Sequence, residues 1–335
     1  MTDYDNLHYI HELGYGYWKS QVLFVAVEMD IFTQIGVCGK SGKVIAKELG
    51  AHPRSTEMLL NALVSLGFLK KMKETFKNTA LSKCYLVKGE PLYQGDRIHH
   101  FHNLWDPWSK LGDAVRSGKP TAFDDVQEEV DEQRLRDFLK SMHNIGSIQV
   151  EEVCRKLKVN EYKNLLDLGG GMGTYAVRFA KENPDLRATV FDLPDVIKIT
   201  DEYIRESGLT DRVETQGGNC LKHGFGRGRF DIVFVSNLLH MYKPVENRNI
   251  LKKCWYSLTK KGIVVVQEFA LNSTKTSPTF GTLFGLNMLV GTLGGAMYSE
   301  AEIKEWFVKV GFKKIKKITI NRDSNLIIGY KMSSV

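Results

Sequence analysis

The chain has 335 residues, which is long enough for two domains that each bury a sizeable core. Hydrophobic residues at 43% and charged residues at 25% match an ordinary soluble globular protein. The Lys and Arg residues behind the formal net charge of +7 are scattered, which argues against a nucleic-acid-binding surface.

The cysteines and the N-terminus bear on metal content and location. The five cysteines are widely separated and include no Cys-x-x-Cys pair, so neither a disulfide framework nor a zinc site is expected. The N-terminus lacks the apolar core of a signal peptide, and no apolar run is long enough to span a bilayer. We therefore expect a cytoplasmic protein with no membrane partner and no metal.

Residues 7–35 carry apolar side chains at helical spacing, and the second part of this segment is apolar nearly all round. A helix that is apolar on all sides cannot bury its whole apolar surface against one face of a single domain. Burial against a second subunit is therefore predicted, with an ordinary core helix as the alternative.

Residues 41–86 show the pattern of a winged helix: helix, turn, helix and hairpin. The second helix begins at Pro53 and stops at Gly67, and it carries Arg54 as a single cation with Glu57 nearby. Phosphate contact needs several cations. A structural or dimer-forming winged helix is therefore favoured over a DNA-binding one.

The aromatic-rich stretch 105–123 is expected to bridge two domains. A long helical region over 126–158 should follow, with a break near residues 144–147. Because that break precedes the next domain, four side chains are candidates to face a cofactor or substrate, with packing and capping as their alternative roles: Met142, His143, Asn144 and Ser147.

Residues 165–174 read as a buried strand, a glycine turn and the start of a helix. Glycines at 169–171 let the backbone turn sharply and approach a ligand closely. Asp167, at the end of the strand, would suit an ammonium or the turn's own N–H groups better than a pyrophosphate. Asp192 stands at the tip of the next strand, where it can accept both hydroxyls of an adenosine ribose. An NAD site fits less well, because Thr174 stands where the dinucleotide pattern has a third glycine.

From residue 164 onward strands alternate with helices, as in a doubly wound sheet. Strands are expected over 164–168, 188–191, 212–216, 231–236 and 262–268, and a closing antiparallel hairpin over 312–320 and 326–331. We predict a winged-helix domain over 1–105, a helical linker over 106–158 and a ligand-binding domain over 159–335.

Ligands in such sheets bind outside the carboxyl ends of the strands. Asn219 and Cys220 follow the third strand, where they can contact an adenine edge. His240 follows the fourth strand and Glu268 ends the fifth. These two strands are expected to be neighbours in this topology, so both side chains can point into one cleft. A neutral His can take a proton from a hydroxyl, and a carboxylate on its other ring nitrogen would fix its tautomer. A structural histidine is the alternative.

The apolar segment 280–292 is too short and Gly-rich for a membrane helix. Phe284, Met288 and Thr292 recur at four-residue spacing on one helix face, which would suit a flat, largely apolar acceptor. Core packing is the alternative role of this face.

Several motifs carry a resemblance to known proteins. Asp167–Gly171 and Phe191–Pro194 resemble motifs I and II of class I S-adenosylmethionine (SAM) methyltransferases. With Leu239-His240, Gln267-Glu268 and Gly294-Gly295, the whole chain resembles the small-molecule O-methyltransferase family that includes plant caffeic acid and animal acetylserotonin O-methyltransferases. The resemblance implies an α/β protein with a mainly helical winged-helix dimerisation domain and a C-terminal Rossmann-like methyltransferase domain with a seven-stranded sheet. It also implies a homodimer.

The same resemblance implies roles for residues. His240 would be the general base, and Glu268 would orient it. SAM would be bound by residues at the strand ends, namely Asp167, Gly169, Gly170, Gly171, Asp192, Leu193, Asn219, Cys220 and Ser236. The substrate pocket would be lined by Met142, Asn144, Phe284, Met288 and Thr292.

Three positions depart from the plant pattern. Met241 stands where plant enzymes have Asp after the base, Ser236 replaces a Lys, and Met297 replaces a second carboxylate beside the His. These changes are compatible with SAM binding but disfavour a phenylpropanoid acceptor. We expect a SAM-dependent, metal-independent O-methyltransferase of a small aromatic hydroxyl compound. Methylation of carbon, nitrogen or sulfur, a non-methylating SAM enzyme, and a SAM-sensing or DNA-binding regulator stay open as alternatives.

Overall fold

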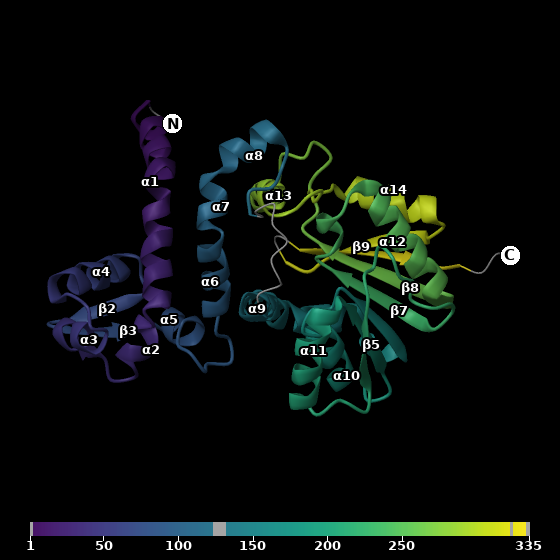
Figure 1. Cartoon of the computed structure of the whole chain (residues 1–335), viewed down its shortest axis with the longest axis horizontal. Helices are drawn as coiled ribbons and strands as arrows, with labels where there is room; N and C mark the ends of the chain where they lie inside the picture. Colours follow the sequence, from purple (N-terminus) through teal and green to yellow (C-terminus); the bar gives the residue numbers. More distant parts are fainter. Residues whose placement is uncertain (1–2, 123–131, 322–323, 333–335) are drawn as a thin grey trace. The chain divides into compact units, whose positions relative to one another are not determined.

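The structure is a computed structural model that describes residues 3–122, 132–321 and 324–332. Contacts within the chain divide it into two compact units, Met1–Leu104 and Trp105–Val335 (Figure 1). Phe123 and residues 126–131, which the sequence assigned to the bridge and to the long helix, lie outside the described residues.

The first unit contains the predicted winged helix. Helices α3 (Gly42–Glu48) and α4 (Pro53–Ser65) pack against a small sheet whose strand order is β1-β3-β2. The strands are β1 (Lys40–Ser41), β2 (Leu69–Met72) and β3 (Thr75–Asn78), and the flanking helices are α1 (Asp3–Glu28), α2 (Ile31–Ile35), α5 (Ala80–Tyr85) and α6 (Gly95–Asn103). The predicted hairpin is thus present, and a short third strand extends it.

The apolar residues of the N-terminal segment differ in how deeply they are buried within the unit. The predicted helical run over 7–35 divides at Asp30, which has a left-handed φ of 55°. Val27, Ile31 and Phe32 are buried in the unit's own core, which fits the alternative of an ordinary core helix for these three residues, whereas Val22 and Phe24 are only half-buried in the single chain. The exposed apolar side chains of α1 are Leu7, Ile10, Leu13, Tyr17 and Trp18.

The second unit is built on a seven-stranded sheet with the order β6-β5-β4-β7-β8-β10-β9. Strands β4 to β8 run parallel, and β10 is antiparallel to both of its neighbours. The strands are β4 (Asn164–Leu168), β5 (Arg187–Asp192), β6 (Val213–Gly217), β7 (Phe230–Ser236), β8 (Leu258–Glu268), β9 (Lys313–Thr319) and β10 (Asn325–Tyr330). Every predicted strand of this domain is therefore present, and the predicted closing hairpin is antiparallel.

Helices cover both faces of this sheet (Figure 1). One face packs against α9 (Glu132–Leu157), α10 (Thr174–Glu182) and α11 (Pro194–Glu206). The other face packs against α12 (Pro244–Ser257) and α14 (Glu300–Val310). The near-continuous apolar runs of β4, β7 and β8 follow from this double burial, because parallel strands covered on both faces have no solvent side.

The remaining helices of this unit are α7 (Trp105–Ser109), α8 (Leu111–Ser117) and α13 (Thr279–Gly291). Trp108 Nε1 donates to Asn287 Oδ1 at 2.8 Å, and the backbone N–H groups of Thr121 and Ala122 donate to Val290 O at 2.9 and 3.1 Å. These bonds tie the bridge segment to α13. Residues 105–122 therefore belong to the same compact unit as the sheet.

The predicted break in the long helix is wrong. Helix α9 continues without interruption through residues 144–147. Gly146 is buried there, and a Cβ on it would lie 3.3 Å from Thr174 Cγ2 and 3.6 Å from Tyr175 Cε2. The glycine therefore serves close packing of α9 on α10, and the favourable energy of this packing outweighs its weak helix propensity.

Candidate functional site

The predicted ligand-binding residues lie together at the carboxyl ends of the parallel strands of the large sheet. From β4 the chain first adds strands on one side, β5 and then β6, and then crosses to the other side of β4 to add β7 and β8. The topological switch point therefore lies between β4 and β7. Parallel pairing brings the carboxyl ends of β4, β5, β6 and β7 to the same edge of the sheet. Doubly wound sheets bind ligands at such a switch point.

The glycine turn after β4 is shaped for close approach. Gly169 and Gly171 have φ values of 68° and 55°, which side chains disfavour. A Cβ on Gly169 would lie 2.8 Å from Leu238 Cδ1, and one on Gly170 would lie 2.8 Å from both Asp167 and Val190. No side chain fits at these positions, so backbone alone faces the ligand edge.

Asp192 braces this turn from the end of β5. Its Oδ2 accepts a hydrogen bond from Gly171 N at 2.9 Å, and its Oδ1 accepts one from Leu193 N at 2.7 Å. Burial raises the pKa of this carboxyl, and the two N–H bonds oppose the rise. Each carboxylate oxygen has a second lone pair, so both oxygens keep the capacity to accept a ribose hydroxyl.

Asp167 lies beneath the turn. It is buried, and its Oδ2 accepts a hydrogen bond from Ala176 N at 3.2 Å, in the first turn of α10. Burial raises the pKa of Asp167 from its ordinary value of 3.8 to about 7, with the bond from Ala176 working in the opposite direction. The bond thus comes from helix α10, which follows the glycine turn, and the expected contact of Asp167 with the turn's own N–H groups stays a prediction.

This raised pKa gives a testable pH dependence. Because the folded chain holds the Asp167 proton more tightly than the unfolded chain, stability falls as pH rises from about 4 to about 7. Asp167→Asn keeps an acceptor for the Ala176 N–H and cannot ionise. We expect it to raise the melting temperature at about pH 8 and to do so less at about pH 5. Thermal scans at both pH values test this, and an effect of equal size at both would contradict it.

Asn219 and Cys220 follow β6, and Ser236 ends β7, two strands that β5 and β4 separate in the sheet. Asn219 Oδ1 accepts from Leu221 N at 2.8 Å, and the Cys220 thiol donates to the Tyr242 hydroxyl oxygen at 3.3 Å. Burial raises the pKa of Cys220, so the thiol keeps the proton it donates. Ser236 Oγ lies 3.5 Å from Gln267 Oε1 on the adjoining strand β8.

His240 and Glu268 meet in the structure. His240 Nδ1 lies 2.9 Å from Glu268 Oε2, and both side chains are buried. Glu268 Oε1 also accepts from Leu239 N at 2.9 Å and from His240 N at 3.4 Å. With a carboxylate at Nδ1, the neutral ring carries its proton there. Nε2 then presents a lone pair.

An aromatic group adjoins the His240 ring. Phe284 of α13 meets it edge to face, with ring centroids 5.1 Å apart and an interplanar angle of 87°. Phe269 and Phe280 lie 5.4 and 5.7 Å from Phe284 by the same measure. Met297 is buried against Phe269 and Phe284, so the position that carries a second carboxylate in plant enzymes here belongs to an apolar wall.

The other predicted substrate residues fall into two groups. Thr292 ends α13, where its hydroxyl donates to Met288 O at 2.6 Å and accepts from Gly295 N at 2.8 Å. A Cβ on Gly295 would lie 2.6 Å from His240 O, so this loop abuts the backbone of His240.

Met142 and Asn144 flank His143 on α9, and His143 Nδ1 lies 2.8 Å from Thr174 Oγ1. The structure thus brings Phe284 of α13 to the His240 ring and His143 of α9 to Thr174 at the start of α10.

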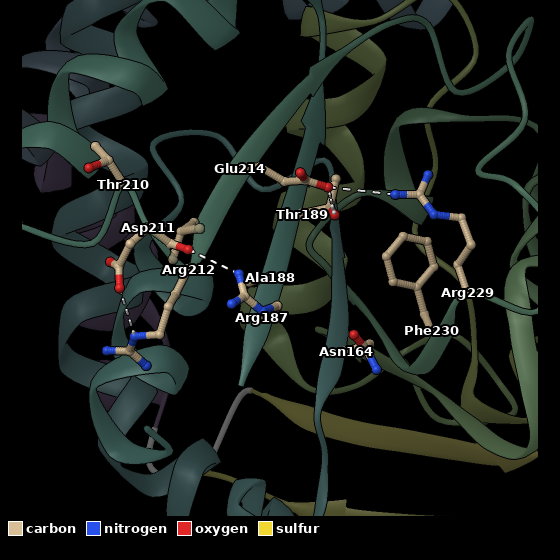
Figure 2. A pocket seen from close by; sticks show the side chains of 11 residues that line it. Asn164, Arg187, Ala188, Thr189, Thr210, Asp211, Arg212, Glu214, Arg229 and Phe230 are labelled. Carbon is tan, nitrogen blue, oxygen red and sulfur yellow. Dashed lines mark hydrogen bonds and ion pairs between the residues drawn. The ribbon is translucent and has the colours of Figure 1, made fainter. Parts of the chain in front are cut away.

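A different pocket lies at the opposite edge of the sheet, where β4 to β7 begin (Figure 2). It has a volume of about 220 Å³ and a largely polar lining. Its charged side chains already have partners within the pocket: Glu214 accepts from the Thr189 hydroxyl at 2.8 Å and pairs with Arg229 at 3.6 Å, and Arg187 donates to the backbone oxygen of Asp211 at 3.1 Å. This pocket lies at the other end of the strands from His240 and the glycine turn, and none of the predicted site residues lines it.

Sequence reasoning missed Phe269 and Phe280, which complete the aromatic group, and Asn247, which lies beneath the His240 turn. Phe269 follows Glu268 directly, so a signal for it was present.

Among the residues that the structure describes, no group of three or more His, Cys, Asp or Glu is arranged to hold a metal. In the same described part, no helix is long and apolar enough to cross a membrane.

Comparison with known proteins gives matches along nearly the whole chain. A family profile for an O-methyltransferase domain matches residues 108–313, and one for an O-methyltransferase dimerisation domain matches residues 11–88.

A 3-hydroxy-5-methyl-1-naphthoate 3-O-methyltransferase from Streptomyces sahachiroi is 29% identical over 92% of this chain and 90% of its own. The N,N-dimethyltransferase OxyT from Streptomyces rimosus is 27% identical over 79% of each. Human N-acetylserotonin methyltransferase in complex with SAM superposes with a TM-score of 0.90 at 23% identity, covering 99% of both chains.

Proposed function

Because the chain belongs to the SAM-dependent O-methyltransferases that carry an N-terminal dimerisation domain, we propose that it methylates a hydroxyl of a flat aromatic molecule, with His240 as the general base. The observation that carries the proposal is the buried pair of His240 Nδ1 and Glu268 Oε2 at 2.9 Å, beside the Phe284 ring.

The strand-end residues fit the cofactor. The turn at Gly169–Gly171 has no side chains, which supports close contact between its backbone and SAM, and the Asp192 carboxylate supports two ribose hydroxyls. Asn219 and Cys220 are proposed to contact the adenine, and Ser236 and Leu193 to complete the site. Once bound, SAM supplies a methyl group activated by the sulfonium.

The chain's own task is then to orient the acceptor and to take its proton. In this proposal, His240 Nε2 accepts the hydroxyl proton as the acceptor oxygen bonds to the methyl carbon, and the sulfur leaves as a neutral thioether. Glu268 holds the ring by Nδ1 and stabilises the imidazolium that forms. Correct alignment of donor and acceptor supplies the remainder of the rate enhancement.

We infer an aromatic acceptor from the apolar side chains that adjoin His240, namely Phe269, Phe280, Phe284 and Met297. Phe269, Phe280 and Phe284 present ring faces and edges, which favour stacked or edge-to-face contact with another ring. We propose that Phe284, Met288 and Thr292, with Met142 and Asn144 from α9, contact the acceptor. The relative from S. sahachiroi, whose name specifies a hydroxynaphthoate, supports this size of acceptor.

Label transfer from methyl-labelled SAM tests the acceptor class. We expect transfer to 2-naphthol and not to decahydro-2-naphthol, which has the same carbon skeleton but is neither flat nor readily deprotonated. An amine of the same size is the third arm, because OxyT is named as an N,N-dimethyltransferase. Preference for the saturated alcohol, or label on nitrogen alone, would contradict the proposal.

We also propose that the chain acts as a homodimer. The match to a dimerisation domain and the exposed apolar residues of α1 support this assembly.

A further inference from the structure

A buried amide lies beneath the turn that carries His240. Asn247, in the first part of α12, is fully buried. Its Nδ2 donates to Leu239 O at 2.8 Å and to Tyr242 O at 3.1 Å. These two carbonyls lie on either side of His240, at the two ends of the short 3-10 turn Leu239–Met241. One side chain therefore spans the turn from its first residue to the residue that follows it.

The direction of this amide is set by its partners. Carbonyl oxygens only accept hydrogen bonds, so the nitrogen of Asn247 must face them. Its Oδ1 is buried and has no hydrogen-bond partner among the described residues. An unpaired buried acceptor is destabilising. Asn247 thus carries a cost in stability while it holds two carbonyls of the His240 turn.

The other bonds of the turn show what Asn247 adds. Glu268 holds the backbone N–H groups of Leu239 and His240, and Ala296 N donates to His240 O at 2.9 Å. The Tyr298 hydroxyl donates to Tyr242 O at 2.5 Å. Among the side-chain donors in these bonds, only Asn247 links the start of the turn to its end.

We propose that Asn247 is a positioning residue for the base: it fixes the turn so that the imidazole meets Glu268 at Nδ1 and directs Nε2 at the acceptor. This inference rests on the proposed role of His240. A displacement of the order of 1 Å in a catalytic group can lower turnover about 100-fold. Asn247 acts through His240 and does not itself touch the reacting atoms.

The chain offers a matched control. Asn183 is also buried, and its Nδ2 donates to Val159 O at 3.0 Å and to Tyr162 O at 2.7 Å. These carbonyls span the 3-10 turn Val159–Glu161 in the same manner, at the opposite edge of the sheet from His240. Asn183→Ala therefore removes the same pair of donor bonds, together with one bond from Asp185 N to Asn183 Oδ1 at 3.0 Å, from a turn that serves no catalytic residue.

We expect Asn247→Ala to lower kcat with 2-naphthol about 10- to 100-fold while KM and the SAM Kd stay within about twofold. Asn183→Ala should lower the melting temperature similarly and leave kcat within about twofold. Tyr298→Phe, which removes only one donor to Tyr242 O and keeps the packing, should show a smaller fall in kcat of the same kind. Normal kcat in Asn247→Ala, or an equal fall in Asn183→Ala, would overturn the inference.

A second readout needs no acceptor. In protein labelled with ¹⁵N at histidine, the Nδ1–H signal of His240, assigned by its loss in His240→Ala, should shift or broaden in Asn247→Ala and stay in place in Asn183→Ala. An unchanged signal in Asn247→Ala would refute the positioning role.

The double variant His240→Ala/Asn247→Ala separates this inference from the proposed function. If Asn247 acts through the imidazole, its loss should cost almost nothing further once the imidazole is gone. Full activity of His240→Ala would reject the base itself. A strongly impaired His240→Ala combined with an equal further loss from Asn247→Ala would reject the positioning role alone.

Discussion

Replacing His240 with alanine is expected to lower kcat about 100- to 10,000-fold. The fall follows from losing the imidazole that the buried Glu268 carboxylate orients through a ring nitrogen at 2.9 Å. The Kd for SAM should stay within about twofold, because the glycine turn and Asp192 are braced by hydrogen bonds to each other that do not involve the imidazole. Single-turnover rates with labelled SAM and calorimetry of SAM binding provide the two measurements.

The control for this variant is His52→Ala. His52 is exposed and lies in the first unit, at the start of α4. We expect its kcat to equal that of the unchanged protein. Near-normal turnover in His240→Ala, with His52→Ala also normal, would remove the general-base assignment and leave methyl transfer to be driven by alignment alone.

The second large effect is expected at α1. Introducing Ile10→Glu and Leu13→Glu together should convert the dimer to monomer, because two carboxylates would be buried without partners in the subunit interface. Both side chains are exposed in the single chain, at 62% and 65%, so the substitutions leave the unit's own core intact. Sedimentation equilibrium gives the mass, and circular dichroism checks the fold.

Val37→Glu is the matched control for this experiment. Val37 belongs to the same unit but lies outside α1, and it is 85% exposed. It should leave the dimer unchanged. A dimer that survives the double substitution in α1 would place the subunit interface elsewhere on the chain.

The sheet and its ligand edge were predictable because they follow from strong local rules. The apolar runs of β4, β7 and β8 predict buried parallel strands, and the glycine turn marks where the first of them ends. The meeting of His240 and Glu268 followed from one topological inference, that the fourth and fifth strands are neighbours, which the structure confirms.

What the sequence could not predict depends on tertiary context. Gly146 suggested a break in α9, but the glycine is buried against α10 in a continuous helix. A glycine that breaks a helix and one that allows close helix packing look the same in the sequence, and only the packed structure distinguishes them. The sequence left an interface and a core helix open for Val27 and Phe32, because the small winged-helix core that buries them is formed by residues remote in sequence. Asn247 gave no signal, since a polar residue near a helix start is ordinary and its two carbonyl partners are known only from the fold.

The bonds from Gly171 N and Leu193 N to Asp192 have a thermodynamic consequence. The loop segments that would surround the adenosine are fastened to one carboxylate by hydrogen bonds within the chain itself. Association then orders little additional backbone, so less conformational entropy is lost and more of the contact energy remains as affinity. The nucleotide end of the site is in this sense preorganised.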